Sequence, residues 1–174
     1  MQMGGIRYDN ATYRTHGDLP AMGSRAPDVS LVNTRLQNVS LANWMGRRKI
    51  MNILVSIDTE ISANSVLRFD RYGAEHQDDL VLLMVSYDLP FALRRFIATH
   101  ELENVVGLSA IRHAGFGENY GVQILEGPLE GMFAPAVVVL DENNTIVHHE
   151  QIEDIKTEPD YRAAFRALGI KIDE

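Results

Sequence analysis

The chain has 174 residues, of which 45% are hydrophobic and 23% charged, as expected for one soluble globular domain that needs no metal or disulfide to fold. Its 16 Lys and Arg residues against 24 Asp and Glu residues give a net charge of −8, which argues against binding to nucleic acid or to an anionic membrane. No apolar run approaches the ~18 residues of a membrane span. The chain has no cysteine, which excludes disulfides, thiolate–metal sites and a thiol nucleophile.

The N-terminal segment alternates polar and apolar residues around Asp9-Asn10, which predicts a β-hairpin over residues 1–16. The first ten residues lack a cationic stretch followed by an apolar core, so we expect no secretory signal and a cytoplasmic location. A connecting segment rich in Pro and Gly follows over 19–27. We expect residues 1–174 to form a single domain.

The rest of the chain shows short apolar runs typical of strands and amphipathic stretches typical of helices. Strands are predicted at 29–32, 39–41, 49–56, 80–86, 105–108, 136–140 and 145–147. Helices are predicted at 43–46 (one turn), 62–72, 91–99 with Pro90 as the first helical residue, and 158–168.

Strands and helices therefore alternate before two strands joined by a tight turn at 141–144 and a final helix. This order predicts an α/β fold with a mixed central sheet flanked by helices. It resembles a thioredoxin-like core with an N-terminal β-hairpin extension. Aromatic and Met residues at element spacing are expected in the core or in an interface. They are Trp44, Met51, Phe69, Met84, Phe91, Phe96 and Phe165.

Common cofactor and metal motifs are missing, so we expect neither a cofactor nor a metal. There is no phosphate-binding loop, and Gly115-Phe116-Gly117 is followed by Tyr120 where a dinucleotide fingerprint requires Gly. His148 and His149 are neighbours on a predicted strand, so their side chains point to opposite faces and do not bind one ion together. The other four histidines are interpreted as surface residues.

Ser62 lies near the start of a predicted helix, directly after a buried strand. A helix N-terminus offers unpaired N–H groups and a partial positive charge, which would lower the pKa of a thiol there. A serine hydroxyl needs a base to react, and no Gly-x-Ser-x-Gly motif is present. The position therefore suits a nucleophile that the chain does not supply, or Ser62 serves only as a cap or first-turn residue.

Several motifs resemble those of bacterial thiol peroxidases, the atypical two-cysteine peroxiredoxins. The loop Ser56-Ile57-Asp58-Thr59, with Ser62 three residues on, resembles their active-site loop, which ends in cysteine. Asp88-Leu89-Pro90-Phe91-Ala92 followed by Arg95-Phe96 is a second hallmark. Further agreements are Asn104-Val105, Tyr120-Gly121-Val122, Gly127-Pro128-Leu129, Ala136-Val137-Val138-Val139 and Thr157-Glu158-Pro159-Asp160-Tyr161. The resemblance extends from about Gly17 to Leu168.

The resemblance implies a thioredoxin-like fold, commonly a homodimer, and reduction of hydroperoxides with a thioredoxin-like partner. In the family a loop cysteine attacks the peroxide, a second cysteine resolves the sulfenic acid, and a threonine and an arginine hold the peroxide. Of these four positions the chain keeps Thr59. It has Ser62 at the peroxidatic position, Ile97 at the resolving position and Pro135 at the arginine position.

These departures predict a member that does not reduce peroxides and is retained as a binding or dimerising fold. Ser62 has no sulfur to be oxidised to a sulfenic acid, and Ile97 cannot form a disulfide. Pro135 removes a fixed cation, and Glu60, where the family has Gly or Pro, opposes an anion at position 62.

Two alternatives remain. In the first, the chain is an ordinary thiol peroxidase whose Ser62 was introduced by engineering. In the second, it is a repurposed enzyme that uses Ser62, Thr59, Asp58 or Glu60. We also predict a cis Ala134–Pro135 bond facing the loop.

Overall fold

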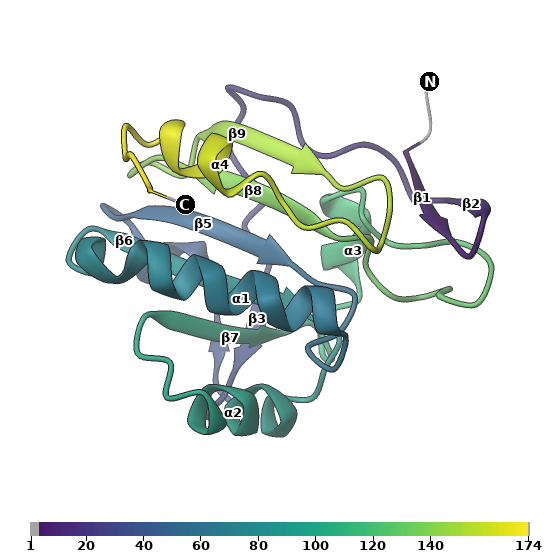
Figure 1. Ribbon diagram of the computed structural model, residues 1–174, viewed down its shortest axis with the longest axis horizontal. Coiled ribbons are helices and arrows are strands. Elements are labelled where there is room, and N and C mark those ends of the chain that lie inside the picture. The colour runs from purple at the N-terminus through teal and green to yellow at the C-terminus, as the bar shows by residue number, and fades with distance from the viewer. Residues whose placement is uncertain (1–3, 174) are drawn as a thin grey trace.

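The computed structural model describes residues 4–173, and a mixed β-sheet with helices on both faces forms its centre (Figure 1). The strands are β1 (Gly5–Tyr8), β2 (Ala11–Arg14), β3 (Leu31–Asn33), β4 (Asn38–Val39), β5 (Arg48–Ile53), β6 (Leu80–Ser86), β7 (Val105–Ser109), β8 (Ala136–Leu140) and β9 (Ile146–Gln151). The α-helices are α1 (Glu60–Gly73), α2 (Pro90–Thr99), α3 (Gly115–Asn119) and α4 (Tyr161–Arg166), and the 3-10 helices are η1 (Leu41–Trp44) and η2 (Ala74–His76).

The central sheet has the strand order β4-β3-β7-β6-β5-β8-β9. The neighbours β5, β6 and β7 run parallel, whereas β3, β4, β8 and β9 join through antiparallel pairs. Every residue of β6 and β8 is buried, because both faces of the sheet are covered. The predicted mixed sheet and thioredoxin-like arrangement are confirmed.

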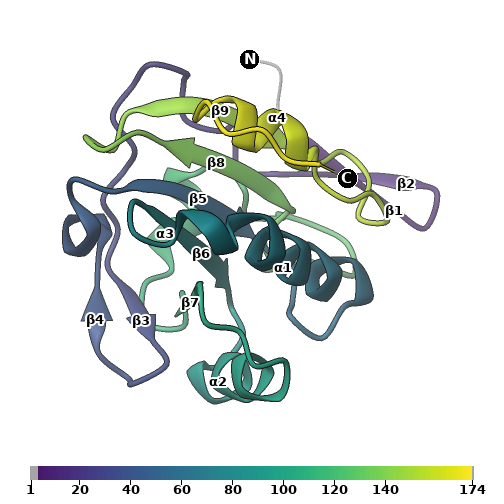
Figure 2. The same cartoon turned by 60° about the vertical axis from the view of Figure 1, so that its left-hand side comes forward.

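Successive residues of the central strands point to opposite faces of the sheet and contribute to two apolar clusters, one on each face. Ile50, Leu82 and Val139 pack with Phe69 of α1 and Phe165 of α4 on one face. The other face holds a cluster that includes residues of α3. Figure 2 shows α1 and α4 together on one side and α3 on the other. Of the residues expected in the core or an interface, Met51, Phe69, Met84 and Phe165 are buried, Trp44 and Phe96 are half-buried, and Phe91 is exposed.

The N-terminal hairpin, β1 and β2, is confirmed as a separate two-stranded sheet. Asp9 and Asn10 at its turn have φ of 46° and 65°, the left-handed conformation that matches the natural twist of paired strands. Ile6 is fully buried against Ile124 and Ala134, and Arg7 forms an ion pair with Asp154. These contacts hold the hairpin to the rest of the chain.

The element boundaries differ from the predictions where the sequence signal is short. Leu41, predicted as the end of a strand, begins η1 instead, and β5 ends at Ile53 rather than Ser56. The helix α3 was not predicted, because its five residues include two glycines and show no clear helical spacing. The helix α1 begins two residues before the predicted start.

The prediction of a cis Ala134–Pro135 bond is wrong, since residues 4–173 contain no cis peptide. The Ala134 N–H donates to the Val122 carbonyl (2.8 Å), and the Pro135 carbonyl accepts from the Ile152 N–H (3.0 Å). These bonds on both sides hold an extended trans chain that runs straight into β8. Trans is the favoured form of an X–Pro bond unless a turn demands otherwise.

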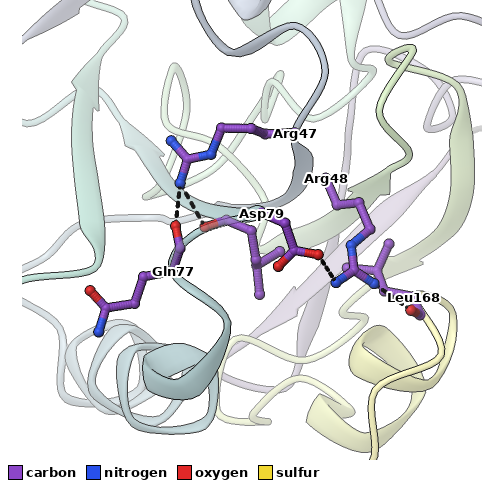
Figure 3. Close-up of polar contacts among 6 residues, drawn as sticks. Arg47, Arg48, Gln77, Asp79 and Leu168 are labelled. Atoms are coloured by element: carbon purple, nitrogen blue, oxygen red, sulfur yellow. Dashed lines mark hydrogen bonds and ion pairs between the residues drawn. The ribbon is translucent and has the colours of Figure 1, made fainter.

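Arg47 and Arg48 stabilise the start of β5, and the loop to α1 follows the other end of this strand. Figure 3 shows the polar contacts of the two arginines. Arg47 Nη2 donates to the carbonyls of Gln77 (2.6 Å) and Leu80 (3.2 Å). Arg48 pairs with Asp79 and donates to the Leu168 carbonyl (2.6 Å). The start of β5 is thereby tied to the chain before β6 and to the end of α4.

Candidate functional site

The loop that connects β5 to α1 is held by one carboxylate from the next strand along the sheet. Asp88 Oδ1 accepts from Ser56 Oγ (2.8 Å), and Asp88 Oδ2 accepts from the Ile57 N–H (2.7 Å) and from Ser86 Oγ (2.6 Å). The carboxyl ends of the parallel strands β5 and β6 meet at one edge of the sheet, so the two loops that follow them are neighbours. The two hallmark motifs of the sequence therefore form one hydrogen-bonded unit around Asp88.

Thr59 is the N-cap of α1 and uses its hydroxyl within the loop. Its Oγ1 accepts from the Ser62 N–H (3.4 Å) and donates to the Ser56 carbonyl (3.0 Å). The first interaction satisfies one of the N–H groups that a helix N-terminus leaves unpaired. The predicted helix entrance is therefore present, with Thr59 as its cap and Ser62 in its first turn.

Ser62 is the third residue of α1, and its side chain is 6% exposed. Its Oγ makes no hydrogen bond to any residue between 4 and 173. Its carbonyl accepts from Ser65 Oγ (2.8 Å), which in turn accepts from Asn52 Nδ2 of β5 (2.8 Å). This buried chain of polar groups fixes the first turn of α1 against the sheet.

Ser62 and Pro135 line the same small cavity, because the start of β8 pairs with the end of β5. The cavity has a volume of about 10 Å³, which is the space that one water molecule requires. Its other walls are mainly apolar and include Ile61, Ile152 and Pro159. Larger hollows of about 210 and 280 Å³ lie elsewhere on the described surface.

No acidic, basic or histidine side chain of the described residues lines this cavity. Asp58 and Glu60 are exposed and do not contribute to its walls. Ser62 therefore has neither a general base to remove its proton nor a cation to hold an oxyanion. The geometry disfavours Ser62, Asp58 and Glu60 as the parts of a repurposed hydrolytic site.

Ile97 of α2 does not line the cavity beside Ser62. It is half-buried against a group that contains Leu54, Ile57, Val66 and Leu93. Of the four positions that the resemblance selects, the structure joins Thr59 to Ser62 by a hydrogen bond and places Ser62 and Pro135 around one cavity. It places Ile97 in the packing between α2 and the loop.

The paired histidines of β9 occupy different environments. His149 Nδ1 lies 3.0 Å from the Pro20 carbonyl, whereas His148 Nε2 is buried without a hydrogen-bond partner. Burial lowers the pKa of His148. Among residues 4–173 no three His, Asp or Glu side chains are grouped as metal ligands.

Sequence reasoning missed the central role of Asp88 and the link between Asn52 and Ser65. The signal for Asp88 was its place in the second hallmark motif, but its partner Ser56 lies 32 positions earlier in the chain. A single sequence offers no way to pair the two. No helix in the described part of the chain has both the length and the apolar character needed to cross a bilayer.

Comparisons with known proteins agree with this geometry. A model of the Redoxin family matches residues 21–165. The chain is 42% identical to a thiol peroxidase of Corynebacterium glutamicum over 155 residues, covering 89% of this chain and 93% of that protein. It is 41% identical to a thiol peroxidase of Mycobacterium bovis, with 89% and 92% covered.

Among solved structures, a thiol peroxidase from Chromobacterium violaceum superposes with a TM-score of 0.89 at 26% identity, covering 95% of both chains. Together with the loop held by Asp88 and capped by Thr59, these relationships show that the chain belongs to the thiol peroxidases of the Redoxin family, as a member that has no cysteine.

Proposed function

We propose that this protein does not reduce peroxides and has kept the thiol peroxidase fold for binding and self-association. The observation that carries the proposal is Ser62, which stands at the peroxidatic position in a water-sized cavity without a base or a cation. Peroxide reduction in the family begins with a thiolate, and the chain has no sulfur at this position.

Three separate steps of the family reaction lack their side chain here. Ser62 cannot become a sulfenic acid, since that chemistry belongs to sulfur. Ile97 cannot close a disulfide with it, and it fills an apolar cluster instead. Pro135 offers no hydrogen-bond donor to a peroxide oxygen or to an anion on residue 62. Thr59, the remaining position, already uses its hydroxyl in the loop.

An exposed apolar surface at the same end of the sheet supports a homodimer. Leu89 and Phe91, after β6, are 52% and 54% exposed, and Ile111, after β7, is 49% exposed. Because β6 and β7 run parallel, the segments after them leave the same end of the sheet, and exposed apolar surface there is typical of an interaction site. We expect a second copy of this chain to cover them, with a thioredoxin-like protein as a further partner and the cytoplasm as the compartment.

A coupled assay with thioredoxin, thioredoxin reductase and NADPH tests the enzymatic part. With the purified protein, hydrogen peroxide or an organic hydroperoxide is expected to cause no more NADPH oxidation than in a blank without protein. Turnover above the blank contradicts the proposal.

Three variants separate the contributions of the missing groups. Ser62→Cys alone is expected to react slowly with peroxide, because no cation stabilises the thiolate or orients the peroxide. Adding Pro135→Arg to Ser62→Cys is expected to speed formation of the sulfenic acid, and Pro135→Arg alone serves as the control. A fast reaction of Ser62→Cys alone shows that only the cysteine was missing, as in an engineered thiol peroxidase.

Sedimentation velocity tests the self-association. The native chain is expected to sediment as a dimer, and Phe91→Glu is expected to shift it toward the monomer by placing a charge in the apolar contact. Thr99→Glu, at the opposite end of α2 and exposed, is the matched control for an added acidic residue. A native chain that stays monomeric at high concentration contradicts the dimer.

A further inference from the structure

The sulfur of this chain resides entirely in its seven methionines. Met51 and Met84 are each 1% exposed, whereas Met22, Met45 and Met132 are 53%, 49% and 38% exposed. A thioether is a two-electron nucleophile that, unlike a thiol, needs no deprotonation before it reacts with a peroxide. The exposed methionines are therefore the groups of this chain with which a hydroperoxide reacts by oxygen transfer.

Met45 differs from the other methionines of residues 4–173 in the contact made by its sulfur. Asn144 Nδ2 donates a hydrogen bond to Met45 Sδ at 3.9 Å, and no other described methionine sulfur has a hydrogen bond. Met45 follows η1, and Asn144 lies in the turn between β8 and β9. The next residue, Gly46, donates its N–H to the Glu142 carbonyl (3.0 Å), so the two segments are held side by side.

The Asn144 backbone is held in a fixed position, while its side-chain amide bonds only to Met45 Sδ and leaves Oδ1 buried without a partner among the described residues. The residue is 3% exposed and adopts a left-handed φ of 63°. Its N–H donates to the Asp141 carbonyl (3.1 Å), and its carbonyl accepts from the Ala26 N–H (2.9 Å). Its Nδ2 group is therefore a donor on a buried residue, at hydrogen-bond distance from the sulfur of a half-exposed methionine.

One oxygen bonded to the sulfur can span the separation between these two atoms. A sulfoxide S–O bond is about 1.5 Å, and a normal N–H···O hydrogen bond is about 2.9 Å between heavy atoms. With the observed 3.9 Å from Sδ to Nδ2 as the third side of the triangle, the angle at the oxygen is about 120°. That angle lies along a lone pair of the oxygen, so the separation suits a hydrogen bond from Nδ2 to a sulfoxide oxygen.

We propose that Met45 is a site at which hydroperoxides form a methionine sulfoxide of one configuration, selected by Asn144. The sulfur lone pair attacks the terminal oxygen of ROOH, the S–O bond forms as the O–O bond breaks, and the proton passes to the leaving oxygen to give ROH. The sulfur is oxidised by two electrons, and the peroxide is reduced to an alcohol or water. Asn144 Nδ2 stabilises the charge that develops on the transferred oxygen, and it then holds the sulfoxide in a hydrogen bond stronger than the one to sulfur.

This site is independent of Ser62 and requires no thiol. Oxygen transfer to a free thioether gives both configurations at sulfur, whereas a donor on one side favours the configuration that directs the oxygen toward it. Oxidation of methionine ordinarily disrupts packing, because a polar group replaces an apolar one. At Met45 the new oxygen meets a donor that is already in place, so the fold is expected to tolerate the change.

Peptide mapping by mass spectrometry after timed exposure of the full chain to hydrogen peroxide tests the proposal. Met45 is expected to oxidise about fivefold faster than Met22, which is equally exposed, because one added hydrogen bond changes a rate by about that factor. Digestion with each of the two stereospecific methionine sulfoxide reductases then gives the ratio of configurations. We expect a ratio of about 5 to 1 at Met45 and a ratio near 1 at Met22.

Two variants remove the donor in different ways, and both residue types tolerate a left-handed φ. Asn144→Asp keeps the shape of the side chain without Nδ2, and Asn144→Gly removes the side chain without adding charge. Both are expected to bring the Met45 ratio to about 1. The proposal is overturned if the native protein shows no bias at Met45 or if the bias persists in both variants. Should either variant fail to fold, the comparison of Met45 with Met22 in the native chain decides alone.

Discussion

Replacing Asp88 with Ala is expected to loosen the loop before α1 and to lower stability by an amount that the structure bounds. The carboxylate accepts three hydrogen bonds, from Ser56 Oγ, the Ile57 N–H and Ser86 Oγ. Hydrogen bonds to a charged group contribute roughly 1.5–3 kcal/mol each, which sets an upper limit of about 5–9 kcal/mol.

The expected loss is smaller, because the half-buried Ser56 hydroxyl can rotate toward water, whereas the Ser86 hydroxyl (0% exposed) and the backbone N–H of Ile57 cannot. Ile57 is only 3% exposed, and an unpaired buried donor costs roughly 1–3 kcal/mol. The Ile57 N–H and the Ser86 hydroxyl both lose their acceptor, so we expect a loss of about 2–6 kcal/mol in the free energy of unfolding, or a fall in Tm of roughly 4–24 °C for a chain of this size.

Thermal and urea unfolding followed by circular dichroism measure this loss. Asp58→Ala is the matched control, since Asp58 lies in the same loop and its exposed carboxylate accepts no hydrogen bond from the described residues. That control is expected to stay within about 0.5 kcal/mol of the native chain. Equal stabilities of Asp88→Ala and the native chain would refute the role of the Asp88 carboxylate in holding the loop before α1.

Two further predictions concern His148 of β9 and Phe69 of α1. His148 has its pKa lowered by burial, despite Glu150 and Asp160 nearby, so the unfolded chain binds more protons than the folded chain below about pH 6.5. The stability of the native chain should therefore fall as the pH drops through that range, and His148→Gln should flatten the fall in urea midpoints between pH 5 and pH 7. Equal slopes for the two proteins count against a buried neutral imidazole. Phe69→Ala should cost about 3–5 kcal/mol, because this 2%-exposed ring contacts Tyr161 at a centroid distance of 4.9 Å. A loss below 1 kcal/mol in urea unfolding would contradict that packing.

The longest apolar runs were the parts of the fold that sequence reasoning placed best. The predicted strands at 80–86 and 136–140 coincide with β6 and β8, because both lie in the buried centre of the sheet and every residue is apolar or small. The short helix α3 escaped prediction, since five residues do not reveal a helical period. The position of α3 depends on Phe116, which packs in the apolar cluster on one face of the sheet with residues distant in sequence.

The candidate site was only partly predictable for a related reason. The resemblance identified Thr59, Ser62, Ile97 and Pro135 as positions, and the structure shows which of them meet. Pro135 reaches the cavity beside Ser62 through the pairing of β5 with β8, a contact across more than 70 positions that no local pattern reveals. The wrong cis assignment at Pro135 came from treating a local motif as decisive, when hydrogen bonds from two distant segments set the chain direction.

The way Asp88 holds the loop has a consequence for how such a protein changes over time. The hydrogen bonds that the Asp88 carboxylate accepts come from Ser56, Ile57 and Ser86, and none comes from residue 62. A substitution at position 62 therefore leaves every hydrogen bond of Asp88 to the loop in place. The shape of the loop and the chemistry of residue 62 are thus set by different side chains, and the one can change without the other.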